Sequence, residues 1–336
     1  MNDRSMLAAQ FLARTDWATA ERGNLAGDAS NRRYERLTKG DQSAVLMDAP
    51  PEKGEDVRPF VRIARFLNSC GLSAPHILAE DSENGFLLLE DLGDDLFARV
   101  VARDPALEMP LYAAATDALA HLHRTPPPDL DAYSPEYMTE MAGLAWGWYQ
   151  RGISGNIDGQ VEFETHFLLT LQQFAPDQTV LIQRDYHAEN LLWLPGRDGV
   201  QRVGLLDFQD ARTGHPAYDL VSLLKDARRD VSPQVERAMI ARYVSETQAN
   251  SDDFEAAYQV LGLQRNLRIL GVFARLSLHF NKPHYVDLIP RVWAHLSAGL
   301  DHPAAAPVAD AIRALPHPTA ENLQQLKDQA GCVPTL

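Results

Sequence analysis

The sequence predicts an α+β protein in two parts: a small, mostly antiparallel sheet with one crossing helix, then a larger and mainly helical part. Three observations support this. Short apolar segments separated by turn residues are concentrated in residues 1–91. Apolar residues at helical spacing cover nearly all of residues 218–315. The other strand-like segments gather on both sides of one polar loop, residues 183–190.

The elements of the first part follow from local periodicity and turn residues. Helical spacing predicts two helices, and Gly71 is a stop signal for the second. Four short apolar runs, paired across the turns "TKGDQ" and "SENG", predict two hairpins. The expected helices are residues 5–15 and 56–71, and the expected strands are residues 31–37, 43–49, 76–81 and 85–91.

The second part is expected to begin after a short apolar and acidic segment at residues 89–93, which is a candidate hinge. Helical spacing continues over residues 109–124, and Ser134–Pro135 marks a helix start before residues 136–150. The strand-like runs here are residues 179–183, 191–194 and 202–208. The predicted division is a nucleotide-binding lobe at residues 1–91 and a catalytic lobe at residues 92–336.

Composition excludes several classes of protein. The chain has 336 residues, 45% of them hydrophobic, and a net charge of −15. Nucleic-acid binding needs basic surface stripes, so we expect no nucleic-acid partner. The acidic surface suits a cationic ligand, or serves solubility alone. No apolar run reaches about 18 residues, and the N-terminus lacks a signal-peptide core, so we expect a cytoplasmic protein without membrane association.

The polar loop "QRDYHAEN" contains the residue types that phosphoryl transfer requires. Asp185 precedes Asn190 by five positions, and Asp207 follows at the end of a strand-like run 17 residues later. Phosphoryl transfer uses one carboxylate to accept the proton of the attacking hydroxyl, and a carboxylate with an amide oxygen to hold Mg²⁺. Mg²⁺ prefers such oxygen ligands. The spacing therefore predicts a catalytic loop followed by a metal loop.

The segment "QRDYHAENLLWL…GLLDFQDARTGHPAYDLVSLL" resembles the aminoglycoside phosphotransferase and choline kinase-like superfamily. That family has an H-G-D-x-x-x-x-N loop, an I-D-F or I-D-W metal loop and a later P-x-x-D-L segment. The resemblance implies a two-lobed, protein-kinase-like fold with ATP between the lobes. It assigns the catalytic base to Asp185, Mg²⁺ ligands to Asn190 and Asp207, and a structural tether to Asp219. The adenine-binding hinge falls on Leu89, Glu90, Asp91 and Leu92.

Within that superfamily, "GDASNRRYERL" and "GHPAYDLVSLLKDARRDV" are similar to bacterial N-acetylmuramate/N-acetylglucosamine anomeric kinases of cell-wall recycling. The similarity implies phosphorylation of the C1 hydroxyl of a free amino sugar by ATP. It also implies that a sugar-1-phosphate nucleotidyltransferase takes the product on to a UDP-sugar. We expect the protein to act as a monomer.

Two positions depart from the superfamily pattern. Gln183 stands where the loop histidine is usual, and its amide can replace a scaffold hydrogen bond without titrating. The second strand lacks the phosphate-binding lysine near Met47, and Asp48 would repel phosphate if it faced inwards. We expect a nearby cation, Lys53 or one of two arginines, to replace it, although an arginine pair on a strand is equally typical of solvated surface. The expected phosphate-binding residues are Gly27, Ala29, Ser30, Asn31, Arg32 and Arg33.

The substrate residues are harder to predict. Aromatic side chains at residues 146–149 could stack on a sugar ring, and Arg151 could meet a carboxylate, but aromatic residues at helical spacing are more often core. The "DARRD" run at residues 226–230 is alternatively a salt-bridged helix end. The histidines at 121 and 123 are expected to be packing or surface residues. The candidate substrate residues are Asp185, Arg184, His187, Asp210, Trp146, Tyr149 and Arg228.

Two other functions stay open at this stage. An aminoglycoside or choline-type kinase shares all the catalytic residues and needs an acidic pocket for its cationic substrate. A pseudokinase that only binds nucleotide is favoured by the missing lysine. The retained Asp185, Asn190 and Asp207 argue against the second alternative, because three retained roles outweigh one that another cation can fill.

Overall fold

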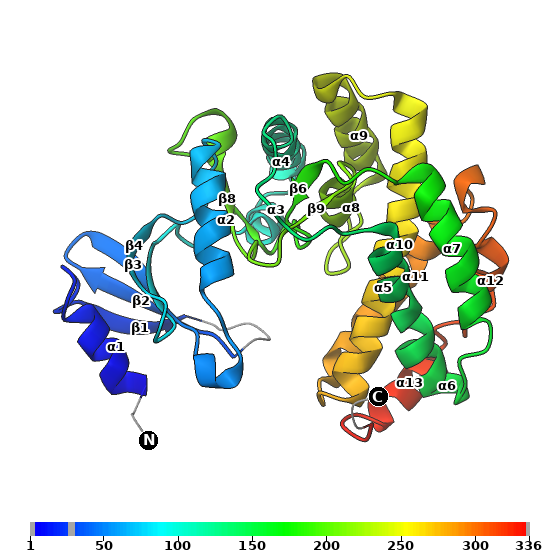
Figure 1. Ribbon diagram of the computed structural model, residues 1–336, viewed down its shortest axis with the longest axis horizontal. Helices are drawn as coiled ribbons and strands as arrows, with labels where there is room; N and C mark the ends of the chain where they lie inside the picture. Colours follow the sequence, from blue (N-terminus) through cyan, green and yellow to red (C-terminus); the bar gives the residue numbers. More distant parts are fainter. Residues whose placement is uncertain (1–3, 26–30, 334–336) are drawn as a thin grey trace. The chain divides into compact units, whose positions relative to one another are not determined.

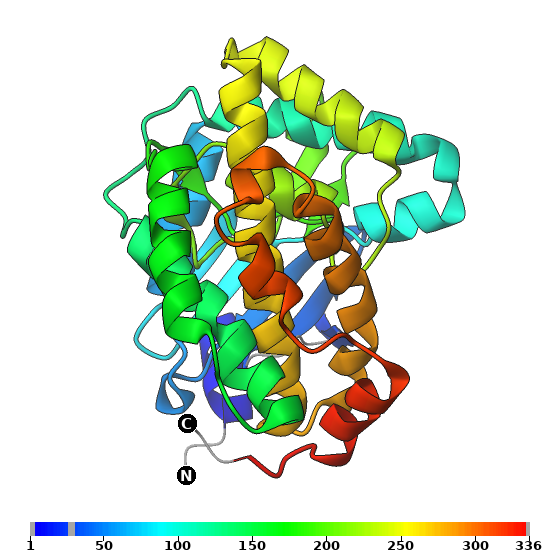
Figure 2. The ribbon, with the colours of Figure 1, turned by 90° about the vertical axis from the view of Figure 1, so that its right-hand side faces the viewer.

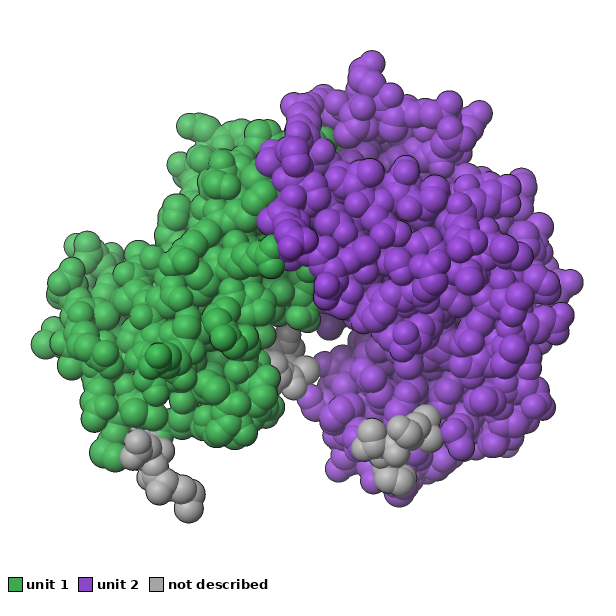
Figure 3. Space-filling view, in the orientation of Figure 1, with its two compact units in different colours: residues 1–122, 188–211 green, residues 123–187, 212–336 purple. Residues whose placement is uncertain are grey.

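The computed structural model describes residues 4–25 and 31–333, which form two compact units (Figure 3). Unit 1 comprises residues 1–122 and 188–211, and unit 2 comprises residues 123–187 and 212–336. The expected boundary at residue 91 differs from this division. Residues 92–122 join unit 1 because helices there pack against the hairpin of residues 191–205. The amide of Trp193, for example, donates to the carbonyl of Asp95 at 2.8 Å.

Unit 1 contains a five-stranded antiparallel sheet in the order β1-β2-β3-β5-β4 (Figure 1). This arrangement confirms the expected α+β class with a small N-terminal sheet. The elements of the sheet region are α1 (Arg4–Leu12), β1 (Glu21–Leu25), β2 (Arg33–Lys39), β3 (Gln42–Asp48), α2 (Arg58–Ser69), β4 (Ile77–Asp81) and β5 (Phe86–Glu90). The rest of unit 1 is α3 (Phe97–Arg103), α4 (Glu108–Leu122), β7 (Leu191–Trp193) and β8 (Val203–Leu205), with short 3-10 turns at Pro51–Lys53, Pro105–Leu107 and Gly199–Arg202.

Helix α1 covers one face of the sheet. Phe11 of α1 stacks on Phe86 of β5 with ring centroids 5.8 Å apart, and Leu46 and Leu88 join the same buried cluster. Because side chains alternate along a strand, Met47 points to the opposite face. The turn between β4 and β5 requires Gly85, since a Cβ there would lie 2.0 Å from the carbonyl oxygen of Ala49.

Unit 2 is mainly helical and is built around the 28-residue helix α10 (Figure 2). Asn250 caps its start by accepting the amides of Asp252 and Asp253, and most of its interior is buried. Helices α5, α7, α8 and α11 pack on it. The elements are α5 (Pro135–Leu144), α6 (Arg151–Ser154), α7 (Gln160–Phe174), β6 (Val180–Ile182), β9 (Arg212–Gly214), α8 (Tyr218–Leu224), α9 (Pro233–Thr247), α10 (Ser251–Leu278), α11 (Ile289–Gly299), α12 (Ala309–Arg313) and α13 (Ala320–Asp328).

One segment of unit 2 departs from regular helix. Helix α5 begins at the Ser134 cap, as the sequence predicts, but it runs into a π-helix at Ala145–Gln150 before α6. Short 3-10 turns lie at Pro283–Leu288 and Pro303–Ala305. No helix among the described residues combines the length and the apolar character that crossing a membrane requires.

Candidate active site

The catalytic loop leaves the short strand β6, whose three residues are fully buried and pair with β9. Helix α8 holds the loop through Asp219, whose carboxylate accepts the amides of Gln183 at 2.6 Å and Arg184 at 2.9 Å. Ser222 of α8 donates to the carbonyl of Arg184 at 3.2 Å. These contacts are the ones that a tethering role for Asp219 requires. Burial raises the pKa of Asp219 to about 7, against the opposing effect of the two amides.

Arg184 occupies the left-handed backbone region, with φ 72°. This conformation is strained for a residue with a long side chain, and such residues concentrate at functional sites. The turn that it makes immediately precedes Asp185. The guanidinium of Arg184 lies over the ring of Tyr133, 5.4 Å from its centroid. The contacts with Asp219 of α8 and the turn at Arg184 together fix the backbone that precedes Asp185.

Asp185 lies among positive charges from helix α10. Burial alone would raise the pKa of Asp185, but the charges of Arg268 and Arg265, with Arg184, lower it below its usual value. A lowered pKa keeps the carboxylate ionised at neutral pH, which is the form that accepts a proton from a hydroxyl. Arg265 and Arg268 belong to no motif in the sequence. The sequence signal for them is weak: with Arg275 they are the three arginines of a long helix whose second half is rich in apolar residues.

His187 is buried and neutral. Burial and the charge of Arg228 lower its pKa to about 3. Its Nε2 lies 3.2 Å from Nη1 of Arg228, so the neutral ring accepts this hydrogen bond from the guanidinium. The amide of Arg228 in turn donates to Asp226 at 2.8 Å. At the end of the same run, Asp230 pairs with Arg291 at 2.7 Å, which is the salt-bridged arrangement that the sequence left open. A substrate role for His187 and Arg228 stays a prediction.

The candidate metal ligands lie in unit 1, at the hairpin of β7 and β8. Asn190 precedes β7, and its carbonyl accepts the amide of Leu206 at 3.0 Å. Asp207 follows β8 with φ 56°, a conformation that aspartate tolerates better than most residues. The Asn190 amide nitrogen lies 3.4 Å from Oδ2 of Asp207, and Gln209 donates to Oδ1 at 2.7 Å. Phe208 anchors the loop by packing on Phe60 of α2, with centroids 4.8 Å apart.

This pair of side chains fits a magnesium site completed by other oxygens. The amide and the carboxylate are hard donors held side by side. Among the residues that the structure describes, no group of three or more His, Cys, Asp or Glu side chains forms a ready-made metal cage. Mg²⁺ usually keeps waters and binds substrate phosphates with only one or two protein ligands, so a two-residue site is consistent with a metal that arrives with a nucleotide.

The candidate hinge follows β5. The Leu89 side chain is 4% exposed, and the amide of Glu90 donates to the carbonyl of His76 at 2.8 Å. Asp91 accepts from Nη2 of Arg36 at 3.1 Å and from the amide of Gly93 at 3.0 Å. Leu89 is thus held by burial, Glu90 through its backbone amide and Asp91 through its side chain. A role for their backbone in binding adenine stays a prediction.

The candidate phosphate-binding residues lie close to one another where the structure describes them. Gly27, Ala29 and Ser30 are outside the described residues. The amide of Asn31 donates to Glu55 at 3.0 Å, and Nε of Arg32 donates to the same carboxylate at 2.9 Å. The Asn31 side chain reaches the carbonyl of Lys53 at 3.4 Å. Arg33 and Lys53 are exposed.

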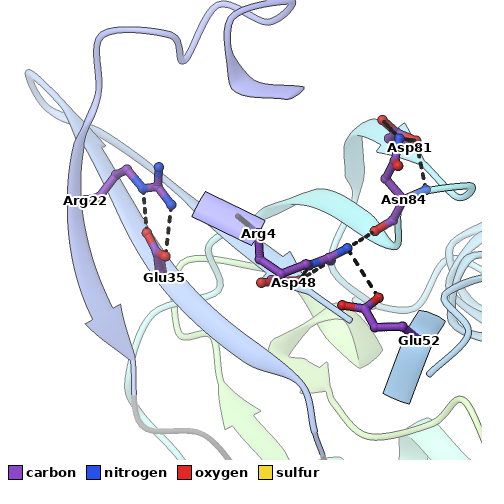
Figure 4. A network of polar contacts seen from close by, with 7 residues as sticks. All are labelled: Arg4, Arg22, Glu35, Asp48, Glu52, Asp81 and Asn84. Atoms are coloured by element: carbon purple, nitrogen blue, oxygen red, sulfur yellow. Dashed lines mark hydrogen bonds and ion pairs between the residues drawn. The ribbon is translucent and has the colours of Figure 1, made fainter. Parts of the chain in front are cut away.

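The position of the missing lysine is filled by packing. Met47 is 1% exposed within the sheet. Asp48, the next residue, is held by the guanidinium of Arg4, which also donates to the carbonyl of Asn84 at 2.8 Å (Figure 4). The Asp48 charge is therefore offset within the protein. The sequence suggested that Asp48 would repel phosphate if its carboxylate were free and faced inwards. Because Asp48 is paired with Arg4, its carboxylate is not free, and this repulsion is not expected.

The aromatic candidates lie in the helical core. Trp146 is 1% exposed and stacks on Phe163 at 4.1 Å between centroids. Tyr149 is fully buried, and its hydroxyl donates to the carbonyl of Pro316 at 2.7 Å. Helical spacing left this packing alternative open, and a sugar-stacking role for these two rings stays a prediction. Asp210, by contrast, is exposed at the metal loop.

The two histidines of α4 and its end also make internal contacts, as expected. His121 Nε2 lies 2.8 Å from the carbonyl of Cys70, and His123 Nδ1 lies 2.6 Å from the hydroxyl of Tyr243. Gln183 is 2% exposed, and within the described chain its side-chain nitrogen has no hydrogen-bond partner. The contact that the structure shows for Gln183 is through its backbone, and the scaffold role of its side chain stays a prediction.

A five-stranded sheet, a helical part, a tethered Asp–x4–Asn loop and an aspartate after a hairpin define a kinase-like phosphotransferase. Comparison with known proteins agrees. The sequence profile described as "Phosphotransferase enzyme family" matches residues 23–257, and the chain belongs to this family.

Two relatives are named N-acetylmuramate/N-acetylglucosamine kinase. The protein from Caulobacter vibrioides is 40% identical over 91% of this chain and 94% of its own length. The protein from Pseudomonas aeruginosa is 34% identical over 87% of both chains. Among solved structures, an ADP-bound aminoglycoside phosphotransferase has a TM-score of 0.58 at 15% identity and covers 91% of this chain and 99% of its own. At that identity the structure supports the shared fold alone.

Proposed function

We propose that this phosphotransferase uses ATP and Mg²⁺ to phosphorylate the anomeric C1 hydroxyl of N-acetylmuramate or N-acetylglucosamine. The observation that carries the proposal is 40% identity over 91% of the chain to a relative with that substrate name. Membership of the phosphotransferase family supports a nucleotide as the phosphate donor. The reaction belongs to the cytoplasm, where ATP is available, and the sugar 1-phosphate suits a nucleotidyltransferase that forms a UDP-sugar.

Phosphoryl transfer assigns a separate task to each of the candidate residues. The C1 oxygen attacks the γ-phosphorus in line, the bond between that phosphorus and the bridging oxygen of ADP breaks, and the hydroxyl proton passes to Asp185. Asn190 and Asp207 would hold Mg²⁺, which would supply positive charge against the phosphates. Asp219 keeps Asp185 in position through the backbone of the two preceding residues.

A panel of acceptors tests the proposal. We expect Mg-ATP with N-acetylmuramate or N-acetylglucosamine to yield ADP and a sugar phosphorylated on C1. Kanamycin and choline are expected to give no product above the ATP hydrolysis background. Phosphorus NMR of the product identifies the position of the phosphate. Transfer to kanamycin or choline alone would favour the aminoglycoside or choline-type alternative, and no transfer to any acceptor would favour the pseudokinase.

The cation that replaces the strand lysine is the second part of the proposal. Arg32 already pairs with Glu55 at 2.9 Å, whereas Arg33 and Lys53 are exposed near it. We expect Arg33→Met or Lys53→Met to raise the KM for ATP by roughly tenfold, the loss typical of one charge-assisted contact. Steady-state kinetics at saturating sugar measures this. Unchanged KM values for Arg32→Met, Arg33→Met and Lys53→Met would contradict the replacement.

A further inference from the structure

Helix α10 carries three arginines whose surroundings differ in charge. Arg265 is 3% exposed, and its charge acts on three carboxyl groups. It helps to lower the pKa of Asp185, and it opposes the burial that raises the pKa of Asp219 and Asp226. Three acidic groups therefore offset this buried cation. The charge of Arg265 is therefore balanced by Asp185, Asp219 and Asp226, and Arg265 needs no bound anion.

Arg268 is shared between the core and the catalytic loop. It lies close enough to Tyr218, Tyr133 and Asp185 for electrostatic interaction with each, and Asp185 is the ionised member of the three at neutral pH. The nearby acid keeps Arg268 protonated. One turn of α10 thus brings a permanent positive charge next to the carboxylate that is proposed to receive the proton of the acceptor.

Arg275 lacks such compensation. Its side chain is partly buried, and among the described residues its Nε has no hydrogen-bond partner and no carboxylate forms an ion pair with it. The charged neighbour that acts on it is Arg268, which together with burial lowers the pKa of Arg275. Partial burial of a guanidinium beside a like charge disfavours its charged form, and a bound anion would offset this effect.

Arg268 and Arg275 lie on one face of α10, since seven residues make almost two turns. Gly271 lies between them on that face. A Cβ on Gly271 would approach the carbonyl carbon and oxygen of Leu144 to 2.3 Å, so α10 contacts the end of α5 there. At this point α5 passes into the π-helix, a local geometry that is frequent at functional sites. The positions of Arg268 and Arg275 along α10 therefore flank a close helix contact at an irregular segment.

We propose that Arg268 and Arg275 form a subsite for the carboxylate of the acceptor sugar, which favours a carboxylate-bearing amino sugar over its neutral counterpart. The inference rests on the proposed function, because it names which of the two sugars the site selects. N-acetylmuramate carries a lactyl carboxylate, and N-acetylglucosamine carries none. A planar guanidinium pairs with a carboxylate through two parallel hydrogen bonds.

A negatively charged group bound by Arg268 and Arg275 could also be a phosphate of the nucleotide. The acceptor is favoured because Arg268 acts on Asp185, the residue that must contact the acceptor hydroxyl. The expected nucleotide residues belong to a different set, in unit 1. The kinetic test below separates the two sources, since a phosphate role changes the KM for ATP whichever sugar is used.

The test compares the kcat/KM of both sugars in Arg275→Met, Arg275→Lys and the exposed control Arg237→Met. We expect Arg275→Met to lower the ratio of N-acetylmuramate to N-acetylglucosamine kcat/KM by about 10- to 100-fold, the loss expected for one charge-assisted pair. Arg275→Lys should keep part of the preference because it keeps the charge. Arg237→Met should leave the ratio at the wild-type value.

Three results would overturn the subsite. These are an unchanged ratio in Arg275→Met, an equal loss with both sugars, or a raised KM for ATP with N-acetylglucosamine as acceptor. Melting temperatures show whether each variant folds, and Arg275→Lys serves if Arg275→Met does not. If the wild type phosphorylates neither sugar, the proposed function fails. Calorimetric binding of N-acetylmuramate and N-acetylglucosamine then still decides the subsite, since only the first should bind more weakly to Arg275→Met.

Discussion

Asp185→Asn is expected to lower kcat by roughly 10²- to 10⁴-fold, the range for loss of a general base, while ATP still binds. Asparagine keeps the size and the hydrogen-bonding oxygen of the side chain but cannot take up the proton. The lowered pKa of Asp185 means that the wild-type carboxylate is already ionised at neutral pH, so the variant removes the working form of the residue. An anomeric hydroxyl is more acidic than an ordinary alcohol, which places the expected loss toward the smaller end.

The measurement pairs steady-state turnover with equilibrium binding of ATP. Glu189→Gln is the matched control, because it removes a carboxylate from an exposed position in the same loop. Asp185→Asn also leaves Arg268 and Arg265 facing less negative charge, so we expect a lower melting temperature. A folded variant that binds ATP and turns over like the wild type would remove Asp185 from the role of base.

Asp207→Asn is expected to have the second large effect. Changes in the groups around a metal ligand cost about 10- to 100-fold in activity, so loss of the ligand charge itself should cost at least about 100-fold. Asparagine is the suitable replacement because Asp207 has φ 56°, a conformation that asparagine also adopts readily. The backbone of the loop after β8 should therefore be preserved.

Titration with Mg²⁺ distinguishes a metal role from a structural one. We expect Asp207→Asn to need a higher Mg²⁺ concentration for half-maximal activity, and excess Mg²⁺ to restore part of the turnover. Asp198→Asn is the control, an exposed carboxylate in the loop between β7 and β8. An Mg²⁺ requirement that is the same in Asp207→Asn and the wild type would contradict the assignment of this ligand.

The fold was predictable where local pattern and burial agree. The amphipathic helix α2 and the hairpin of β2 and β3 follow directly from apolar spacing and turn residues. Strand β1 has four exposed residues out of five and no apolar alternation, so nothing in its sequence distinguishes it from a loop. Its pairing with β2 depends on backbone hydrogen bonds that any residue can make.

The site was predictable only where residue type and spacing are unusual. Asp185, Asn190 and Asp207 combine a fixed interval with flanking strand-like runs, and few structures other than a kinase-type loop require that pattern. Trp146 and Tyr149 show the opposite case. Helical spacing brings them to one side of a helix but does not say what lies opposite, and the structure fills that space with other core residues.

By itself, the sequence determined the class of fold, the reaction type and the residues proposed for proton and metal binding, because these depend on local order along the chain. Only the tertiary structure decided which charges surround them. Asp219 meets the loop from 34 residues beyond Asp185, and Arg268 and Arg265 act on Asp185 from a helix still further on. Electrostatic effects depend on distance in space, and the chain order does not contain those distances.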